Sequence, residues 1–164
     1  MNTGQMLLTI GAMILLATIM LRVNTSTLQT MTSTYNSKYD ILAASIANSI
    51  IEEAKDKKFD EATVSSAVSS TYSLTSSGNL KAEYGETYPD FDDFDDYNGY
   101  TKIDSTIFPT LFKAVCTVEY ITDLNPDVKS LTQTWTKKIT VAVSSDATTD
   151  TVKLSSLYSY WVFR

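Results

Sequence analysis

The stretch GQMLLTIGAMILLATIMLR, residues 4–22, decides how this chain is organised. It is apolar on every side of a helix, and no charged side chain occurs before Arg22. More than a hundred mostly polar residues, rich in Ser and Thr, follow it in the 164-residue chain. A helix without a polar face needs a membrane, a protein core or other apolar helices around it.

The helical pattern continues beyond Arg22. Apolar residues recur at spacings of three or four, as on one face of an α-helix. They are Leu28, Met31, Tyr35, Tyr39, Leu42, Ile46 and Ile50. No proline occurs before Pro89. The sequence therefore predicts one helix from about residue 3 to about residue 56, apolar all round in its first half and on one side in its second.

Three interpretations of the N-terminal segment differ in what surrounds it. A cleaved secretory signal starts with basic residues and ends at a small-residue cleavage site, whereas MNTGQ has no basic residue. A transmembrane anchor needs ~20 apolar residues, a length that Met6–Leu21 slightly misses and Met1–Leu21 meets. A buried core helix is seldom apolar all round in so small a domain.

After Pro109 the apolar residues recur every second position, which is typical of strands. Strands are predicted at residues 112–120, 139–143 and 152–163, with turns at residues 124–127 and 144–146. Such short connections favour an antiparallel meander. A short helix over residues 61–72, with Asp60 as its N-cap, is also predicted. The fold class is α+β: a long N-terminal helix packed by its second half against a C-terminal antiparallel sheet.

This architecture resembles that of the type IV pilin and pseudopilin family. Members of that family begin with a short uncharged apolar helix that carries one Glu at its fifth position, where this chain has Gln5 within MNTGQMLL. The family's proline near the middle of this segment is also absent here. The resemblance implies a hydrophobic assembly or transmembrane helix over residues 1–24. It implies a globular head over residues 25–164 that includes the amphipathic half of the helix.

The resemblance further implies a structural subunit of an extracellular filament on the cell surface, inserted in a membrane before assembly. Its partners would be copies of itself, the inner membrane and the pilus assembly machinery. Two alternatives stay open: a pseudopilin or minor pilin of a secretion machine, and a single-pass membrane-anchored extracellular binding domain. The expected assembly surface is Gln5, Met6, Leu7, Leu8, Ile10, Met13, Ile14, Leu15, Leu16, Ile19, Met20 and Leu21.

The run YPDFDDFDDYNGY, residues 88–100, is the densest signal in the polar part. Oxygen-rich loops with a glycine turn hold Ca²⁺, although the EF-hand spacing is not met because Tyr97 follows Asp95-Asp96. The candidate ligands are Asp90, Asp92, Asp93, Asp95, Asp96 and Asn98. The alternative is a solvated acidic loop anchored to the domain by its aromatic rings. No other cofactor is expected.

Composition narrows the classes of function. The chain has no histidine, which removes the commonest general base, and no nucleophile motif or phosphate loop, so we expect no enzyme. Its single cysteine, Cys116, excludes an intrachain disulfide and is expected in the core. Trp135 and the run Tyr158–Trp161 are expected in the core and in interfaces. A net charge of −6 without a basic stripe argues against a nucleic-acid partner.

Overall fold

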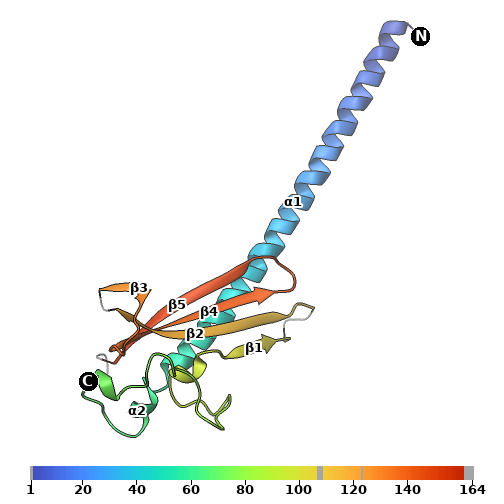
Figure 1. Ribbon diagram of the computed structural model, residues 1–164. Helices are drawn as coiled ribbons and strands as arrows, with labels where there is room; N and C mark the ends of the chain where they lie inside the picture. The colour runs from blue at the N-terminus through green and yellow to red at the C-terminus, as the bar shows by residue number, and fades with distance from the viewer. Residues whose placement is uncertain (1, 107–108, 123, 161–164) are drawn as a thin grey trace. The chain divides into compact units, whose positions relative to one another are not determined.

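A computed structural model of the chain describes residues 2–106, 109–122 and 124–160. Its first element is helix α1, Thr3–Lys55, drawn in blue to cyan in Figure 1. Neither proline nor, after Gly11, glycine interrupts these residues, and Ala, Leu, Ile and Met are frequent among them. The prediction of one helix from about residue 3 to about residue 56 is confirmed.

The sheet is antiparallel throughout and has five strands in the described residues. The strands are β1 (Thr101–Asp104), β2 (Phe112–Thr122), β3 (Asn125–Lys129), β4 (Thr136–Ser145) and β5 (Thr151–Ser159). Neighbouring strands follow the order β1-β2-β4-β5, and β3 pairs with the end of β2 (Figure 1). The predicted antiparallel meander of β2, β4 and β5 is confirmed.

Two strands were not predicted, and one of them replaces a predicted turn. The stretch over residues 124–127 has turn chemistry, yet Asn125–Lys129 forms the exposed strand β3. Its register against β2 shifts between Ile121 and Thr122. Pro126 is tolerated because β3 lies at an edge, where a missing N–H breaks no central ladder. The other, β1, is only four residues long. The last strand ends at Ser159, and residues 161–163 of its predicted range lie outside the described residues.

The second helix is much shorter than predicted. Helix α2 covers only Glu61–Val64, and a single 3₁₀ turn, Thr71–Ser73, lies further along the predicted range. Serines at 65, 66, 69 and 70 explain the early end, because their hydroxyls compete for backbone partners. The predicted N-cap is confirmed: the Asp60 side chain accepts from the Ala62 N–H and forms a capping box with Thr63.

The core of the head lies between the last turns of α1 and one face of the sheet. The helix contributes Ala43, Ala47, Ile50, Ile51 and Ala54, all buried. The sheet contributes alternate residues of β2 and β4, so that Cys116 pairs with Val141 and Val118 with Ile139. Three of the five helix residues are alanine, which lets the helix backbone approach the sheet closely. Cys116 is a buried core residue, as predicted.

The chain divides into two compact units, Met1–Lys38 and Tyr39–Arg164. Of the apolar stripe on α1, Tyr39, Leu42, Ile46 and Ile50 belong to the second unit and pack in or against its core. At the other end of the core, Trp135 stacks on Tyr160 with ring centroids 5.4 Å apart, and Tyr158 is buried. Trp161 lies outside the described residues.

Overpacking the alanine face should destabilise the head. Ala47 has no exposed surface, so Ala47→Leu should lower the free energy of unfolding by about 1–3 kcal/mol, as extra methylenes do in a packed core. Ser45→Leu adds a side chain of the same size at an exposed position and should change it by less than about 0.5 kcal/mol. Urea unfolding of the full chain in detergent measures both. Equal stability of the two variants would contradict this packing.

Candidate functional site

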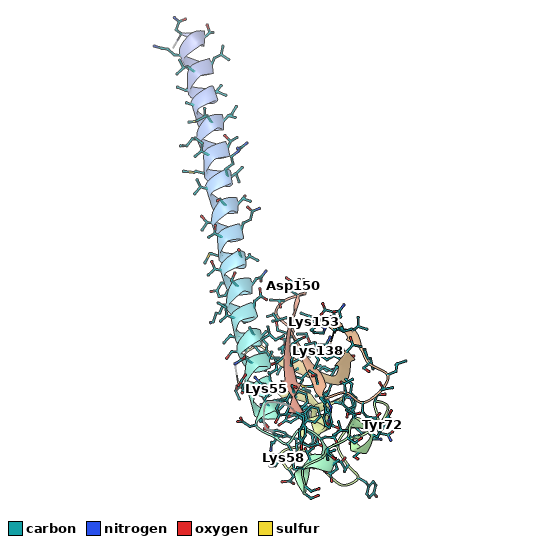
Figure 2. The ribbon with its side chains drawn as sticks, turned by 90° about the vertical axis from the view of Figure 1, so that its left-hand side faces the viewer. Lys55, Lys58, Tyr72, Lys138, Asp150 and Lys153 are labelled. Carbon is teal, nitrogen blue, oxygen red and sulfur yellow. The ribbon has the colours of Figure 1, made fainter. Side chains whose placement is uncertain are left out.

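The N-terminal unit presents an apolar surface around the whole helix. Every described residue from Asn2 to Lys38 is exposed. The large apolar side chains between Met6 and Leu21 keep from 48% (Ile19) to 74% (Leu8) of their surface open. Figure 2 shows side chains standing out on every side of this part of α1. All twelve residues expected on the assembly surface lie here and are exposed: Gln5, Met6, Leu7, Leu8, Ile10, Met13, Ile14, Leu15, Leu16, Ile19, Met20 and Leu21.

Seven threonine hydroxyls on this helix donate to backbone carbonyls of the same helix. Thr9 and Thr18 donate to the carbonyls of Met6 and Leu15, each at 2.8 Å. Five more threonines between residues 25 and 34 donate to the carbonyl four residues earlier. A hydroxyl that is bonded to its own helix costs little to bury. The threonines are therefore compatible with an apolar surrounding, which the periodicity of apolar residues alone does not reveal.

Small residues open gaps in the surface of the same helix. A side-chain carbon added at Gly4 or at Gly11 would meet nothing within 4 Å, so neither glycine is required by packing inside the subunit. Two glycines seven residues apart lie on one face of a helix. Such residues let another helix approach closely. Gln5 lies in the first turn of α1, where its backbone N–H donates to the Asn2 carbonyl at 2.8 Å.

Beyond the apolar segment, three members of the predicted stripe stay exposed. Leu28, Met31 and Tyr35 keep more than half of their surface open. They carry an apolar line along a helix that otherwise shows Thr, Ser and Asn. The helix is long and apolar enough to cross a membrane by length and composition, and its most apolar stretch has no buried residue. The unit Met1–Lys38 thus exposes apolar surface on all sides at its start and along one line further on.

The acidic loop, residues 88–100, is not solvated throughout. Its rings anchor it as predicted, since Phe91, Phe94 and Tyr97 are buried and Tyr100 is half-buried. The expectation that its acids face solvent is wrong for Asp93, Asp95 and Asp96, which are at most 2% exposed. The sequence does not indicate this burial, because Lys137, which contacts Asp95, lies 42 residues after it, in β4. Asp90 and Asp92 are exposed.

Hydrogen bonds within the loop hold the buried acids in place. Asp93 Oδ1 accepts from the N–H groups of Asp95 (2.6 Å) and Asp96 (3.2 Å). Asp96 Oδ2 accepts from the N–H groups of Asp92 and Asp93, each at 3.0 Å. Asp95 and Asp96 begin the 3₁₀ turn Asp95–Tyr97. The side chains of Asp93 and Asp96 therefore supply the hydrogen-bond acceptors that backbone carbonyls would supply in a regular element.

The amide of Asn98 fastens the loop to the sheet. Its Nδ2 donates to the Leu80 carbonyl at 2.6 Å and its Oδ1 accepts from the Val118 N–H of β2 at 2.9 Å. Gly99 follows with φ +85°, a conformation that favours glycine. Its N–H donates to the Cys116 carbonyl at 3.0 Å. Asn98 has a structural use for both of its polar atoms.

The pKa values of the buried acids are shifted in different directions. Burial raises the pKa of Asp93 to about 9, with the carboxyls of Asp95 and Asp96 adding to the effect. Burial also raises the pKa of Asp95 to about 7, although Lys137 opposes this. Burial would likewise raise the pKa of Asp60, but Lys137 and hydrogen bonds from Thr75 and Ala62 hold it below its ordinary value. Asp60 is thus the ionised partner of Lys137, and Asp93 stays protonated at neutral pH.

Of the six predicted Ca²⁺ ligands, only Asp96 joins a group of acids close enough to share a cation in the described residues. The other members are Glu83 and Glu86, whose oxygens lie within 4.8 Å of one another and of Asp96. Burial and a hydrogen bond with Glu86 raise the pKa of Glu83 to about 7. Ca²⁺ binding by the loop stays a prediction, with Asp96 as the one ligand common to both sets.

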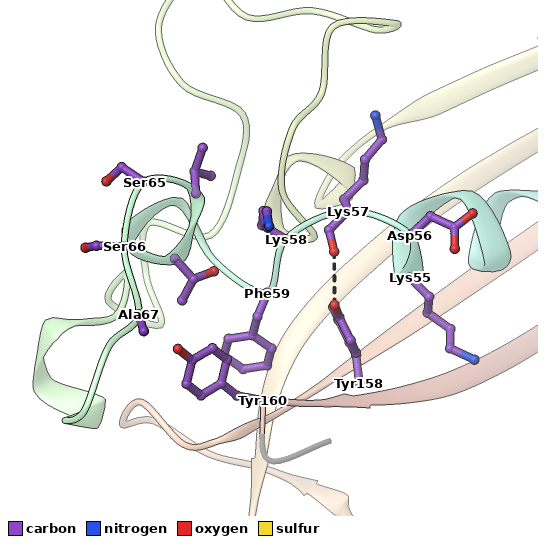
Figure 3. A pocket seen from close by; sticks show the side chains of 12 residues that line it. Lys55, Asp56, Lys57, Lys58, Phe59, Ser65, Ser66, Ala67, Tyr158 and Tyr160 are labelled. Carbon is purple, nitrogen blue, oxygen red and sulfur yellow. Dashed lines mark hydrogen bonds between the residues drawn. The ribbon is translucent and has the colours of Figure 1, made fainter. Parts of the chain in front are cut away.

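A pocket of about 530 Å³ lies where α1 ends (Figure 3). Lys55, Lys57 and Lys58 line it, together with residues 63–67 and the rings of Tyr158 and Tyr160. Tyr158 donates its hydroxyl to the Lys57 carbonyl at 3.0 Å, the dashed line in Figure 3. Phe59 packs against both tyrosine rings, with centroids 5.7 and 5.6 Å away. The buried Phe59 ring separates this pocket from Lys137, whose Nζ lies 4.5 Å from the ring centroid.

Comparison with known proteins gave no match, whether to a family model, to a curated protein or to a solved structure.

The protonated state of Asp93 predicts how the free energy of unfolding depends on pH. The unfolded carboxyl loses its proton near pH 4 and the folded one only near pH 9, so unfolding is favoured increasingly as pH rises between these values. Asp93→Asn keeps the acceptor for the two N–H groups and cannot ionise. It should therefore be more stable than the parent at pH 8, by at least about 1 kcal/mol, and equal to it at pH 4.

Urea unfolding at the two pH values measures this difference. Asp90→Asn removes a carboxylate at an exposed position of the same loop and serves as the control, with no such pH-dependent gain. A stability difference for Asp93→Asn that is the same at pH 4 and pH 8 would contradict the assignment.

Proposed function

We propose that this protein is the structural subunit of a type IV pilin-like extracellular filament, which assembles through its hydrophobic N-terminal helix. The observation that carries the proposal is the two-part character of α1. One continuous helix has no buried residue from its start to Lys38, and contributes five buried residues to the core of the head between Ala43 and Ala54. A helix exposed over such a length with large apolar side chains requires apolar surroundings that the subunit itself does not supply.

Two surroundings meet this requirement in succession. Before assembly the apolar segment lies in the inner membrane, where its backbone is satisfied within the helix. After assembly it packs against the same segment of neighbouring subunits. Apolar surface buried in this way gains ~25 cal/mol per Å² relative to water, but relative to lipid the gain comes from closer packing. Glycines and internally bonded threonines favour that packing, because they allow close approach without stranding hydroxyl groups.

Copies of one chain form a filament when each uses two different surfaces. A contact between unlike patches that does not close into a ring propagates as an open helix. The exposed stripe Leu28, Met31 and Tyr35 extends the apolar surface beyond the membrane-length segment, as continued contact between neighbouring subunits requires. Gln5 would make a polar contact at the start of the helix, since its amide accepts a hydrogen bond from an amine on a neighbour.

The pseudopilin and the single-pass anchor are the rival proposals. The length of the apolar helix supports an anchor as well as a filament. The stripe from Leu28 to Tyr35 favours assembly, because an anchor that only holds a head at the membrane has no use for apolar residues at this point. Electron cryo-microscopy of material sheared from producing cells separates the three. Long filaments with bundled helices support the subunit, and protein that stays in the membrane fraction supports its rivals.

A charge in the apolar segment should abolish assembly. Leu15→Asp places a carboxylate where a helix bundle offers no solvent, so no filaments should form while the head stays folded. Tyr72→Asp is the control: it introduces the same charge on the head, where Tyr72 points outward (Figure 2). Negative-stain microscopy counts filaments, and circular dichroism reports the fold. Filaments of normal number from Leu15→Asp would overturn the proposal.

A large residue at Gly11 tests packing without adding charge. A side-chain carbon at Gly11 meets nothing within 4 Å in the subunit, and Gly11→Leu increases helix propensity by up to about 1 kcal/mol, so membrane insertion and folding should be kept. Close approach of neighbouring helices would be blocked, and filament yield should fall at least severalfold in the same microscopy. Met13→Leu, a change at an exposed position of the same helix that nearly conserves volume, is the matched control. Equal yields from the two variants would contradict close packing at Gly11.

A further inference from the structure

Lys137 brings together two aspartates from distant parts of the chain. Its Nζ contacts Asp95 Oδ1 and donates to Asp60 Oδ2 at 2.8 Å and to the Phe59 carbonyl at 2.8 Å. The lysine lies in β4, Asp95 begins a 3₁₀ turn of the acidic loop and Asp60 caps α2. All three residues are at most 1% exposed. An amine, a carboxyl and a second carboxyl are thus in contact, out of reach of solvent.

Aromatic rings enclose this group. The Nζ of Lys137 lies 4.5 Å from the centroid of the Phe59 ring and 5.1 Å from that of Tyr120. Phe94 has no exposed surface and precedes Asp95 in the chain. The Tyr120 hydroxyl donates to Asp60 Oδ2 at 3.0 Å. Rings on several sides keep bulk water out, which strengthens electrostatic interactions and prevents hydrolysis of a bond formed inside.

As three separate side chains, the group leaves a buried polar atom without a hydrogen-bond partner in the part of the chain that the structure describes. Asp95 Oδ2 is buried and has no hydrogen-bond partner among the described residues, and the same is true of Oδ2 of the neighbouring Asp93. Asp60 accepts several hydrogen bonds, whereas Asp95 has only Lys137. Because burial raises the pKa of Asp95 to about 7, its carboxyl holds a proton much of the time. A neutral carboxyl has an electrophilic carbon that an amine can attack.

We propose that Lys137 and Asp95 condense into an intramolecular amide bond, with Asp60 as the carboxylate that moves the protons. The proposal does not depend on filament assembly, because all the groups belong to the head.

The reaction balances without an outside reagent. Asp60 takes a proton from the Lys137 ammonium, and the free Nζ electron pair forms a bond to Cγ of the protonated Asp95 carboxyl. Asp60 returns that proton to the Asp95 hydroxyl, the Cγ–O bond breaks with its electron pair, and water leaves. Asp60 then takes a second proton from the nitrogen. Of the three ammonium protons, one stays in the amide, one leaves in the water and one rests on Asp60.

The product removes two charges from the buried group. Amide formation removes the buried ammonium and takes away one of the two Asp95 oxygens, so that one buried oxygen fewer needs a partner. The remaining N–H can donate to Asp60 or to the Phe59 carbonyl, both of which accept from Nζ already. Asp60, once protonated, is neutral in its buried position. The bond joins residues 42 positions apart and ties the acidic loop covalently to β4.

Intact-mass spectrometry of the purified full chain, compared with its sequence mass, tests the proposal. We expect a mass lower by one water molecule. Digestion with trypsin should yield a branched peptide that joins residues 82–102 to residues 130–138, with no cleavage after Lys137. The branched peptide distinguishes the amide from a cyclic imide at an aspartate, which also loses water but links no second peptide. A full sequence mass, or a water loss without the branch, would overturn the proposal.

Variants test the identity of the groups. Lys137→Arg should restore the full mass, whereas Lys138→Arg, the control one position along β4, should keep the water loss. Asp95→Asn should lose ammonia instead of water and reach the same product mass as the parent, a result that an ion pair cannot imitate. Asp60→Asn should leave most of the protein unreacted. If Lys137→Arg does not fold, the parent and Asp95→Asn still decide the matter, since unreacted Asp95→Asn and parent differ in mass.

Discussion

The polar half of this protein depends on the contacts of the buried Lys137 Nζ with Asp60, Asp95 and the Phe59 carbonyl. The partners of Nζ cap α2 at Asp60, begin the 3₁₀ turn of the acidic loop at Asp95 and include the carbonyl of Phe59. Two segments that lack long regular structure, residues 59–60 and the acidic loop, therefore meet at one cation on β4. Burying a charge costs several kcal/mol unless partners surround it, so this site constrains how the loops fold. The excess of carboxyls over cations also supports the proposed condensation of Lys137 with Asp95.

The long helix is governed by a different constraint. Its last turns present alanine and isoleucine to the sheet, and this face belongs to an ordinary α+β core. Its N-terminal part has no such face, because large apolar residues occur on every side. One helix thus serves two environments, a protein core and an apolar surrounding supplied by membrane or by other subunits. This division supports the proposed filament, in which the head would stay folded while the exposed part of the helix exchanges lipid for protein.

Local sequence patterns predicted those helices, strands and caps that neighbouring residues determine. The spacing of Tyr39, Leu42, Ile46 and Ile50 predicted the helix, alternation predicted β2, β4 and β5, and Asp60 predicted a cap. Strand β3 could not be predicted, because its chain has turn chemistry and only pairing with β2 makes it a strand. The prediction that the acids of the loop face solvent was wrong for a similar reason. Acids beside aromatic rings look exposed in the sequence, and only the folded sheet places Lys137 next to Asp95. Long-range partners, unlike periodicity, leave no trace in the neighbouring residues.

The end of α1 is where the long helix meets the polar group around Lys137. In the proposed filament, load would pass through the bundled helices, and each head is held to the last turns of α1 by the packing of a few alanines and isoleucines. Phe59 and Asp60 come directly after the turn that ends α1, and both accept hydrogen bonds from Lys137 in the sheet. A polar group at this point fixes the chain where the helix leaves the core. An amide between Lys137 and Asp95 would make the loop beside that point inseparable from β4, so that unfolding of the head could not begin there.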